Sequence, residues 1–190
     1  MAEFFTLGQI RTKLKQDLDL EQEQFVTASE LTGYINEAID DAEAIIHGLY
    51  RDYFLTQENL SLVNGTKEYA LPTGIYANKI RRLLYDNGTR KYRVQRLKQL
   101  DLIMNIDSDE QFRYVLRNDA AGTYTFDFYP TPEKNETDVI SIWYIRNANR
   151  LSAETDVCDI VDFVNYIFAH VYWDRDWETI KRVSASSIVS

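Results

Sequence analysis

The spacing of apolar residues predicts two amphipathic helices at the N-terminal end of the chain. The first covers about 6–18, and the second, which has the strongest helical pattern in the sequence, runs from about 28 to about 54. A possible capping box of Thr6 and Gln9 opens the first helix. A second box of Thr27 and Glu30 opens the long helix.

The long helix is expected to bury one face and expose the other. Its apolar stripe comprises Leu31, Tyr34, Ile35, Ala38, Ile39, Ala42, Ile46, Leu49, Tyr50 and Tyr53. The opposite face carries four acids: Glu37, Asp40, Asp41 and Glu43. Such a pattern is typical of a helix that covers a core on one side.

From residue 58 the apolar residues alternate with polar ones, which predicts strands. Asn64-Gly65 is typical of a tight hairpin turn, with the return strand ending at Pro72. A second hairpin is expected to turn at 86–88. The remaining expected elements are one or two helical turns at 97–106, strands at 112–117, 123–129 and 138–146, and a helix at 159–182.

These elements predict an α+β fold with helices segregated at the two ends of the chain. The middle is expected to be an antiparallel sheet or barrel-like unit of about seven short strands. We expect a single domain over 1–190, built from N-terminal helices (1–56), a β-rich middle (57–150), a C-terminal helix (151–183) and a frayed tail (184–190).

Charge is distributed unevenly along the chain. The net charge is −9, but residues 79–98, called here the basic segment, hold eight cations and one acid. A basic sheet face with interleaved tyrosines can follow a phosphate backbone, which would make the chain a nucleic-acid-binding module. We favour docking on an acidic protein neighbour or on the acidic helix of a neighbouring copy, since the rest of the chain would repel a duplex. The candidate interface residues are Arg81, Arg82, Tyr85, Arg90, Lys91, Tyr92 and Arg93.

Residues that carry catalysis or bind metals are scarce. One cysteine and two histidines cannot build the usual cysteine- or histidine-rich zinc sites, and glycine-rich phosphate loops and serine-hydrolase motifs are missing. We expect His47, His170 and Cys158 to be structural. A carbohydrate-active enzyme built on a carboxylate pair is a further alternative. The sequence predicts no cofactor, no membrane helix and no secretion signal.

Several stretches, read in order, resemble the head-to-tail adaptor, or connector, proteins of tailed bacteriophages, particularly the ring beneath the portal of short-tailed phages. They are the helix at 31–38, the turn and Leu-Pro strand end at 64–72, the strand at 79–85, and the strand, Pro-x-Pro turn and strand ending in Tyr at 124–132 and 139–144. The resemblance spans about 28–172. The Ser-rich ending after Trp177 departs from the longer charged arm that the family often has.

The resemblance implies a non-enzymatic structural protein of the virion, made in the host cytoplasm and placed at the head–tail junction. It implies a ring of twelve copies that attaches to the portal, contacts downstream tail proteins and lets double-stranded DNA pass without specific binding. In such a ring we expect the helical acids Glu37, Asp40, Asp41 and Glu43 to face the channel, where their charge would repel DNA.

Overall fold

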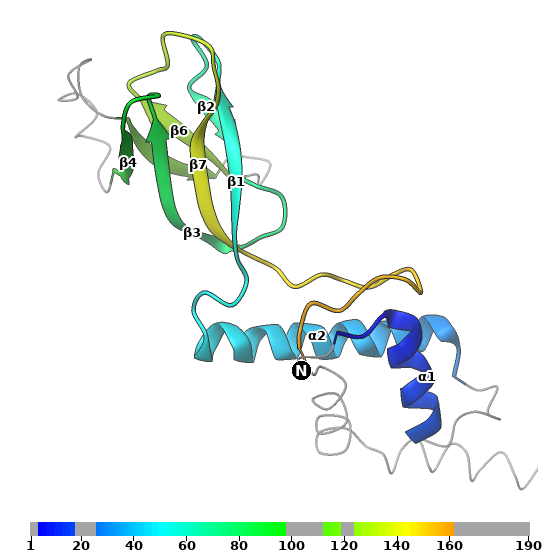
Figure 1. Cartoon of the computed structure of the whole chain (residues 1–190). Helices are drawn as coiled ribbons and strands as arrows, with labels where there is room; N and C mark the ends of the chain where they lie inside the picture. The colour runs from blue at the N-terminus through cyan, green and yellow to red at the C-terminus, as the bar shows by residue number, and fades with distance from the viewer. Residues whose placement is uncertain (1–3, 18–25, 98–111, 119–123, 162–190) are drawn as a thin grey trace, which may run out of the picture. The chain divides into compact units, whose positions relative to one another are not determined.

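The computed structural model describes residues 4–17, 26–97, 112–118 and 124–161 (Figure 1). The chain forms two compact units. The first comprises Met1–Arg51 and Ala148–Ser190, and the second is the intervening Asp52–Asn147. The chain therefore leaves the first unit after the long helix and returns to it after the last strand.

Two helices, α1 (Leu7–Asp17) and α2 (Ala28–Leu49), belong to the first unit. Both predicted capping boxes are present. The Thr6 amide donates to Gln9 Oε1 at 2.8 Å, and the threonine hydroxyl accepts from the Gln9 amide at 3.3 Å. The Thr27 amide donates to Glu30 Oε2 at 2.7 Å, and the Glu30 amide donates to the Thr27 hydroxyl at 3.2 Å. Local sequence therefore fixes where each helix begins.

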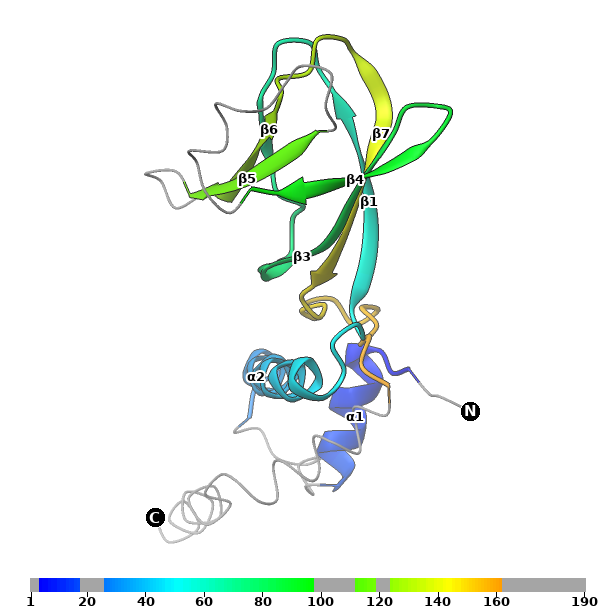
Figure 2. The same ribbon diagram turned by 90° about the vertical axis from the view of Figure 1, so that its left-hand side faces the viewer.

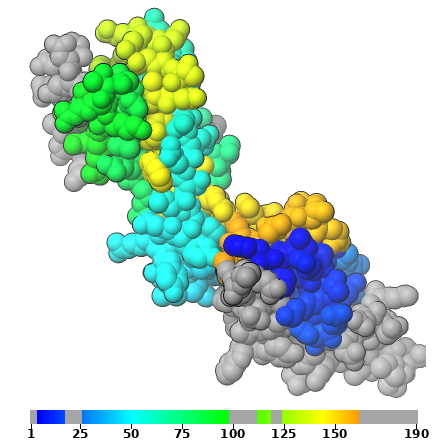
Figure 3. All heavy atoms as spheres, viewed as in Figure 1, coloured from blue at the N-terminus to red at the C-terminus, as the bar shows by residue number. Residues whose placement is uncertain are grey.

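The returning chain at 148–161 packs on these helices. Val157 forms an antiparallel bridge with Thr6, and the Asn36 side chain donates to and accepts from the backbone of Leu151 at 2.9 Å. Figure 3 shows α1 (blue) beside the returning segment (orange). The buried apolar residues of the unit are Leu7, Ile10, Leu14, Leu31, Ile35, Ala38, Ile39, Ala42, Ala148, Leu151, Cys158 and Ile160.

The long helix is shorter than its apolar pattern predicts. α2 ends at Leu49 rather than near residue 54, because Tyr50 takes extended dihedral angles (φ −125°, ψ 92°) and the chain turns towards the second unit. Tyr34, Leu49, Tyr50 and Tyr53 were expected in the core, but all are exposed. The C-terminal helix expected at 151–183 is not present over its described residues, 151–161, where the chain forms turns and Val157 bridges to Thr6 instead. The rest of that helix, nearly all of the helical turns expected at 97–106 and the tail at 184–190 lie outside the described residues.

The described part of the second unit is one sheet of seven strands that curls into a half-barrel (Figure 2). The strands are β1 (Leu55–Leu62), β2 (Glu68–Ala70), β3 (Ile75–Asp86), β4 (Lys91–Arg96), β5 (Arg113–Asn118), β6 (Tyr124–Tyr129) and β7 (Glu136–Arg146). Their spatial order is β1-β7-β3-β4-β5-β6-β2. The predicted α+β class with about seven strands is confirmed.

Two strand pairings differ from the prediction. β4 and β5 run parallel, with Gln95 opposite Arg113, and the long connection between them permits this. The Asn64-Gly65 turn is present, with Gly65 at φ 73°, but it closes no hairpin because β1 pairs with β7 and β2 pairs with β6. The Gly65 amide donates to the Pro132 carbonyl at 2.8 Å, so the β6–β7 connection holds this turn instead.

An aromatic core fills the inner face of the sheet. Phe126 and Phe128 are fully buried, and their rings meet edge to face with centroids 5.1 Å apart. Tyr69 packs against both rings. The other buried members are Leu62, Leu83, Val94, Tyr114, Ile140, Ile142 and Tyr144. Because side chains alternate along a strand, the residues between these core positions point to the outer face.

Candidate functional site

The basic segment forms the predicted β3–β4 hairpin, and strand register decides which of its side chains share a face. Leu83 and Val94 lie opposite each other and are buried on the inner face. The neighbouring positions therefore point outward, where Leu84 lies opposite Arg93 on β4, and Arg82 lies opposite Trp143 on β7. We call Arg82, Leu84, Arg93 and Trp143 the outer sheet patch. Both arginines are exposed, and Leu84 and Trp143 are half-buried.

Two other cations of the basic segment are held in ion pairs within the second unit. Arg81 Nε lies 3.0 Å from Asp52 Oδ1, and Lys91 Nζ lies 3.5 Å from Asp86 Oδ2. Both pairs are at the surface, where such contacts contribute little stability. They nevertheless reduce the net charge that Arg81 and Lys91 present to a partner.

Arg82 and Arg93 differ from these cations. Neither forms an ion pair with another residue in the ranges that the structure describes. Arg90, at the hairpin turn, lies over the ring of Tyr92 with its guanidinium carbon 5.5 Å from the ring centroid. The uncompensated charge of the outer sheet patch therefore resides on Arg82 and Arg93.

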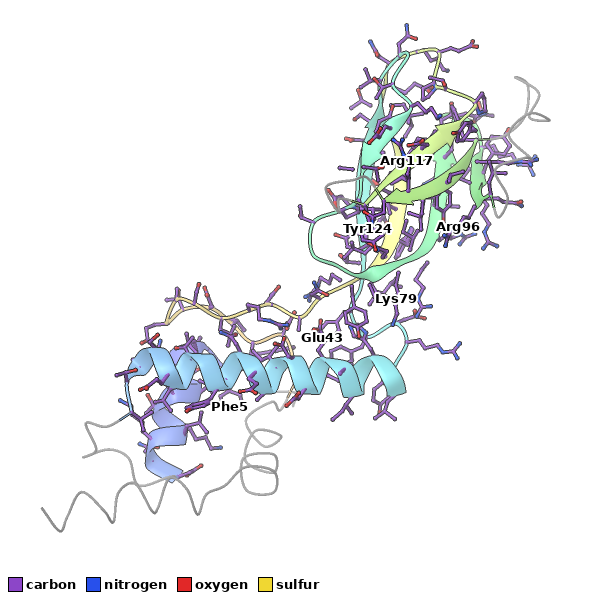
Figure 4. The ribbon with its side chains drawn as sticks, turned by 180° about the vertical axis from the view of Figure 1, so that it is seen from behind. Phe5, Glu43, Lys79, Arg96, Arg117 and Tyr124 are labelled. Atoms are coloured by element: carbon purple, nitrogen blue, oxygen red, sulfur yellow. The ribbon has the colours of Figure 1, made fainter. Side chains whose placement is uncertain are left out.

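A second charged cluster, on β2, β5 and β6, is internally neutralised. Arg117, which Figure 4 labels on the sheet, pairs through Nη2 with Glu68 and lies 3.6 Å from the buried carboxylate of Asp127. Lys67 Nζ lies 3.7 Å from the same carboxylate. The two cations and two carboxylates of this cluster balance, so it offers no net charge to a partner.

The two tyrosines of the basic segment lie on the inner side of the hairpin. Tyr85 is opposite Tyr92, two residues along each strand from the buried Leu83–Val94 pair. The Tyr85 hydroxyl donates to Glu136 at 3.0 Å, and its ring meets Phe112 edge to face. Burial raises the pKa of Tyr85, and the Glu136 carboxylate raises it further. The contacts of Tyr85 therefore support the core, which the sequence pattern did not show.

The acids of α2 fall into two groups. Glu37 and Asp41 are exposed, and Asp40, also exposed, forms an ion pair with Arg150 on the returning chain. These three acids lie at the surface, as the sequence predicts. The helix contains no lysine or arginine between Ala28 and Leu49, so its surface is acidic.

Glu43 does not belong to this exposed face, and the prediction that it does is wrong. Its side chain is buried, and Oε1 accepts a hydrogen bond from the Ala148 amide at 2.6 Å (Figure 4). Arg150 Nη2 and His47 Nε2 lie 3.5 Å and 3.7 Å from its two oxygens. Glu43 therefore binds the returning chain to α2. It is buried because that chain covers a side of the helix that would otherwise be exposed.

Part of the predicted apolar stripe of α2 lies on an exposed side of the helix, together with Ile45, which the stripe did not include. Tyr34, Ile45 and Leu49 are 56 %, 47 % and 70 % exposed. Spacings of three or four residues align them with Glu37 and Asp41 along one side of the helix. We call Tyr34, Glu37, Asp41, Ile45 and Leu49 the α2 row. The available signal was an apolar pattern wider than one buried stripe requires.

The described residues contain no group of three or more His, Cys, Asp or Glu residues that could hold a metal ion. Cys158 is buried, and burial raises the pKa of its thiol to about 11, so the unreactive thiol form dominates at neutral pH. None of the helices described is long and apolar enough to cross a membrane.

Comparison with known proteins identifies the family. No curated protein matches the chain. The family model described as SU10 adaptor protein matches residues 5–180, a range that contains all of the second unit and most of the first. The match agrees with the resemblance noted from the strands and turns of the sequence. Because it covers most of the 190 residues, the chain belongs to the SU10 adaptor protein family, a family of phage head-to-tail adaptors.

Proposed function

We propose that this protein forms a ring of twelve copies that attaches to the portal and extends the DNA channel towards the tail. The observation that carries the proposal is the family match over 5–180, which includes the helical unit, the curled sheet and the segment that returns from one to the other. Downstream tail proteins would bind the opposite side of the ring. DNA would pass through it without being retained.

The surface chemistry supports an assembly role. The exposed Tyr34 on α2, and the exposed Arg beside Trp on the sheet, are residue types enriched at protein interfaces, and the exposed Ile45 and Leu49 add apolar area to the helix surface. A net charge of −9 on each copy would make a ring strongly negative, which disfavours retention of DNA phosphates. A structural protein of the virion needs these two properties together.

Co-sedimentation with purified portal rings tests this function. The protein should pellet with portal rings and stay in the supernatant without them, at a saturating and fixed ratio. As a control, the Glu43→Ala variant should lose portal binding only as far as it loses helical structure, because Glu43 acts within the fold. Failure of the folded wild-type protein to associate with the portal would contradict the proposal.

DNA binding by the outer sheet patch is the second candidate, because Arg82 and Arg93 are exposed and have no ion-pair partner among the described residues. If this patch binds duplex, log affinity should fall against log salt by about 0.9 for each phosphate contacted. The Arg82→Glu, Arg93→Glu variant should then flatten the slope by about 2. We expect little duplex binding at physiological salt, and salt-dependent binding with unaffected portal association would support the alternative.

A further inference from the structure

The two exposed surfaces described above are complementary in chemistry. The α2 row offers apolar side chains and two carboxylates, on a helix without lysine or arginine. The outer sheet patch offers two arginines beside a half-buried leucine and tryptophan. Each surface supplies what the other lacks, since an unpaired guanidinium can bind a carboxylate and stack on an aromatic ring.

We propose that the α2 row of one copy docks on the outer sheet patch of the next copy. The proposal rests on the proposed function, because a ring requires that copies bind one another. Glu37 and Asp41 would face Arg82 and Arg93, while Tyr34, Ile45 and Leu49 would cover Leu84 and Trp143. This interface uses two different surfaces of the same chain, and such head-to-tail contacts generate rings when the rotation between copies closes.

Three observations favour a second copy over other occupants. Both surfaces are present on every chain, so each copy can bind one neighbour through its α2 row and another through its outer sheet patch. The other strong charge cluster of the sheet, at Asp127, is neutralised internally, whereas Arg82 and Arg93 have no ion-pair partner among the residues described. The α2 row also places apolar residues among its acids, which suits a protein surface better than a phosphate backbone. In this arrangement, Glu37 and Asp41 lie between copies rather than at the channel wall.

Paired charge reversal tests the interface. One variant carries Glu37→Lys with Asp41→Lys, and the other carries Arg82→Glu with Arg93→Glu. Each variant alone should associate with itself at least about tenfold more weakly than wild type, because like charges then face each other. An equimolar mixture should recover association, since alternating copies restore opposite charges at every interface. A chain carrying all four reversals should also recover it.

Sedimentation velocity over a range of concentrations, with and without portal rings, provides the measurement. Asp17→Lys with Glu133→Lys is the matched control, because both acids are exposed, lie outside the two surfaces and change net charge equally. The control should associate like wild type. Ile45→Ala should weaken association while the circular dichroism spectrum stays unchanged.

The outcomes distinguish failure of the proposed interface from failure of the proposed portal attachment. Recovery in the mixture without portal binding would support the interface and contradict portal attachment. Portal binding without recovery in the mixture would overturn the interface and leave the adaptor function standing. A wild-type protein that stays monomeric with and without portal rings, or a basic reversal that affects only DNA binding, would also overturn the interface.

A double-mutant cycle covers the case in which a reversal variant does not fold. The neutral pairs Glu37→Gln with Asp41→Asn, and Arg82→Gln with Arg93→Gln, keep similar shapes and remove charge. Each pair alone should weaken association, and combining them in one chain should weaken it no further, because the same contacts are already lost. Additive losses from the two pairs would show that the surfaces do not meet.

Discussion

Replacing Ile39 with alanine should destabilise the helical unit, whereas the same replacement at Ile45 should not. Both residues lie on α2, but Ile39 is 0 % exposed and Ile45 is 47 % exposed. The change removes a methyl and an ethyl group, so lost burial at Ile39 costs about 2.4 kcal/mol at about 0.8 kcal/mol per carbon group. The remaining cavity brings the cost to about 2–5 kcal/mol. At Ile45, alanine's higher helix propensity offsets the smaller loss, leaving a change within about 0.5 kcal/mol.

Thermal unfolding followed by far-UV circular dichroism checks this pair, because the helices dominate that signal. A loss of 1 kcal/mol lowers the midpoint by about 2–4 °C in a chain of this size, so Ile39→Ala should unfold roughly 4–20 °C below wild type. Ile45→Ala and Asp41→Ala should unfold within about 2 °C of it. Equal midpoints for Ile39→Ala and Ile45→Ala would show that the buried and exposed sides of α2 are assigned wrongly, and the α2 row would be wrong with them.

Three further outcomes are expected. Glu43→Ala should lower the free energy of unfolding, measured by chemical denaturation, by about 1–3 kcal/mol, because the Ala148 amide loses its acceptor. Glu43→Gln should lower it less, because an acceptor remains, and equal decreases for the two variants would contradict this role. Cys158 should react with a thiol reagent about 100-fold more slowly than an exposed cysteine at pH 8, since its pKa is about 11, against an ordinary value of 9.0; rapid labelling of the native protein would show that the thiol is accessible. Hydrogen bonds from the Ala153 and Ser152 amides lower the pKa of Asp156, so its stabilising effect should be present above pH 3.8 and be lost as the pH falls through the lowered pKa. The stability difference between wild type and Asp156→Asn should therefore shrink in acid, and a constant difference would argue against this linkage.

Features that depend on neighbouring residues were predictable from the sequence. Thr27 and Glu30 are three residues apart, so their capping box could be recognised without knowledge of the fold. The β3–β4 hairpin was equally local, because Asn87 Oδ1 accepts from the Thr89 and Arg90 amides within the same turn. The alternation of buried and exposed residues along β3 and β4 then put Arg82 and Arg93 on the outer face, as expected for charged strand residues.

Features that depend on distant residues were not predictable. Glu43 was predicted to lie with the exposed acids of α2, but it is buried, because its partner Ala148 lies 105 residues away along the chain. Tyr85 looked like an exposed aromatic among cations, yet its acceptor Glu136 lies 51 residues away. The Asn64-Gly65 turn has the sequence of a hairpin, but its flanking strands pair with β7 and β6 instead of with each other. In each case, a tertiary contact overrides what the local pattern favours.

The mass of portal rings after incubation with this protein tests the central claim most directly. Native mass spectrometry of the purified complex, compared with portal rings alone, counts the bound copies. We expect one discrete complex, heavier than the portal by twelve times the 22.3 kDa of a single chain. Portal rings of unchanged mass, or a ladder of masses without a closed stoichiometry, would contradict the ring adaptor.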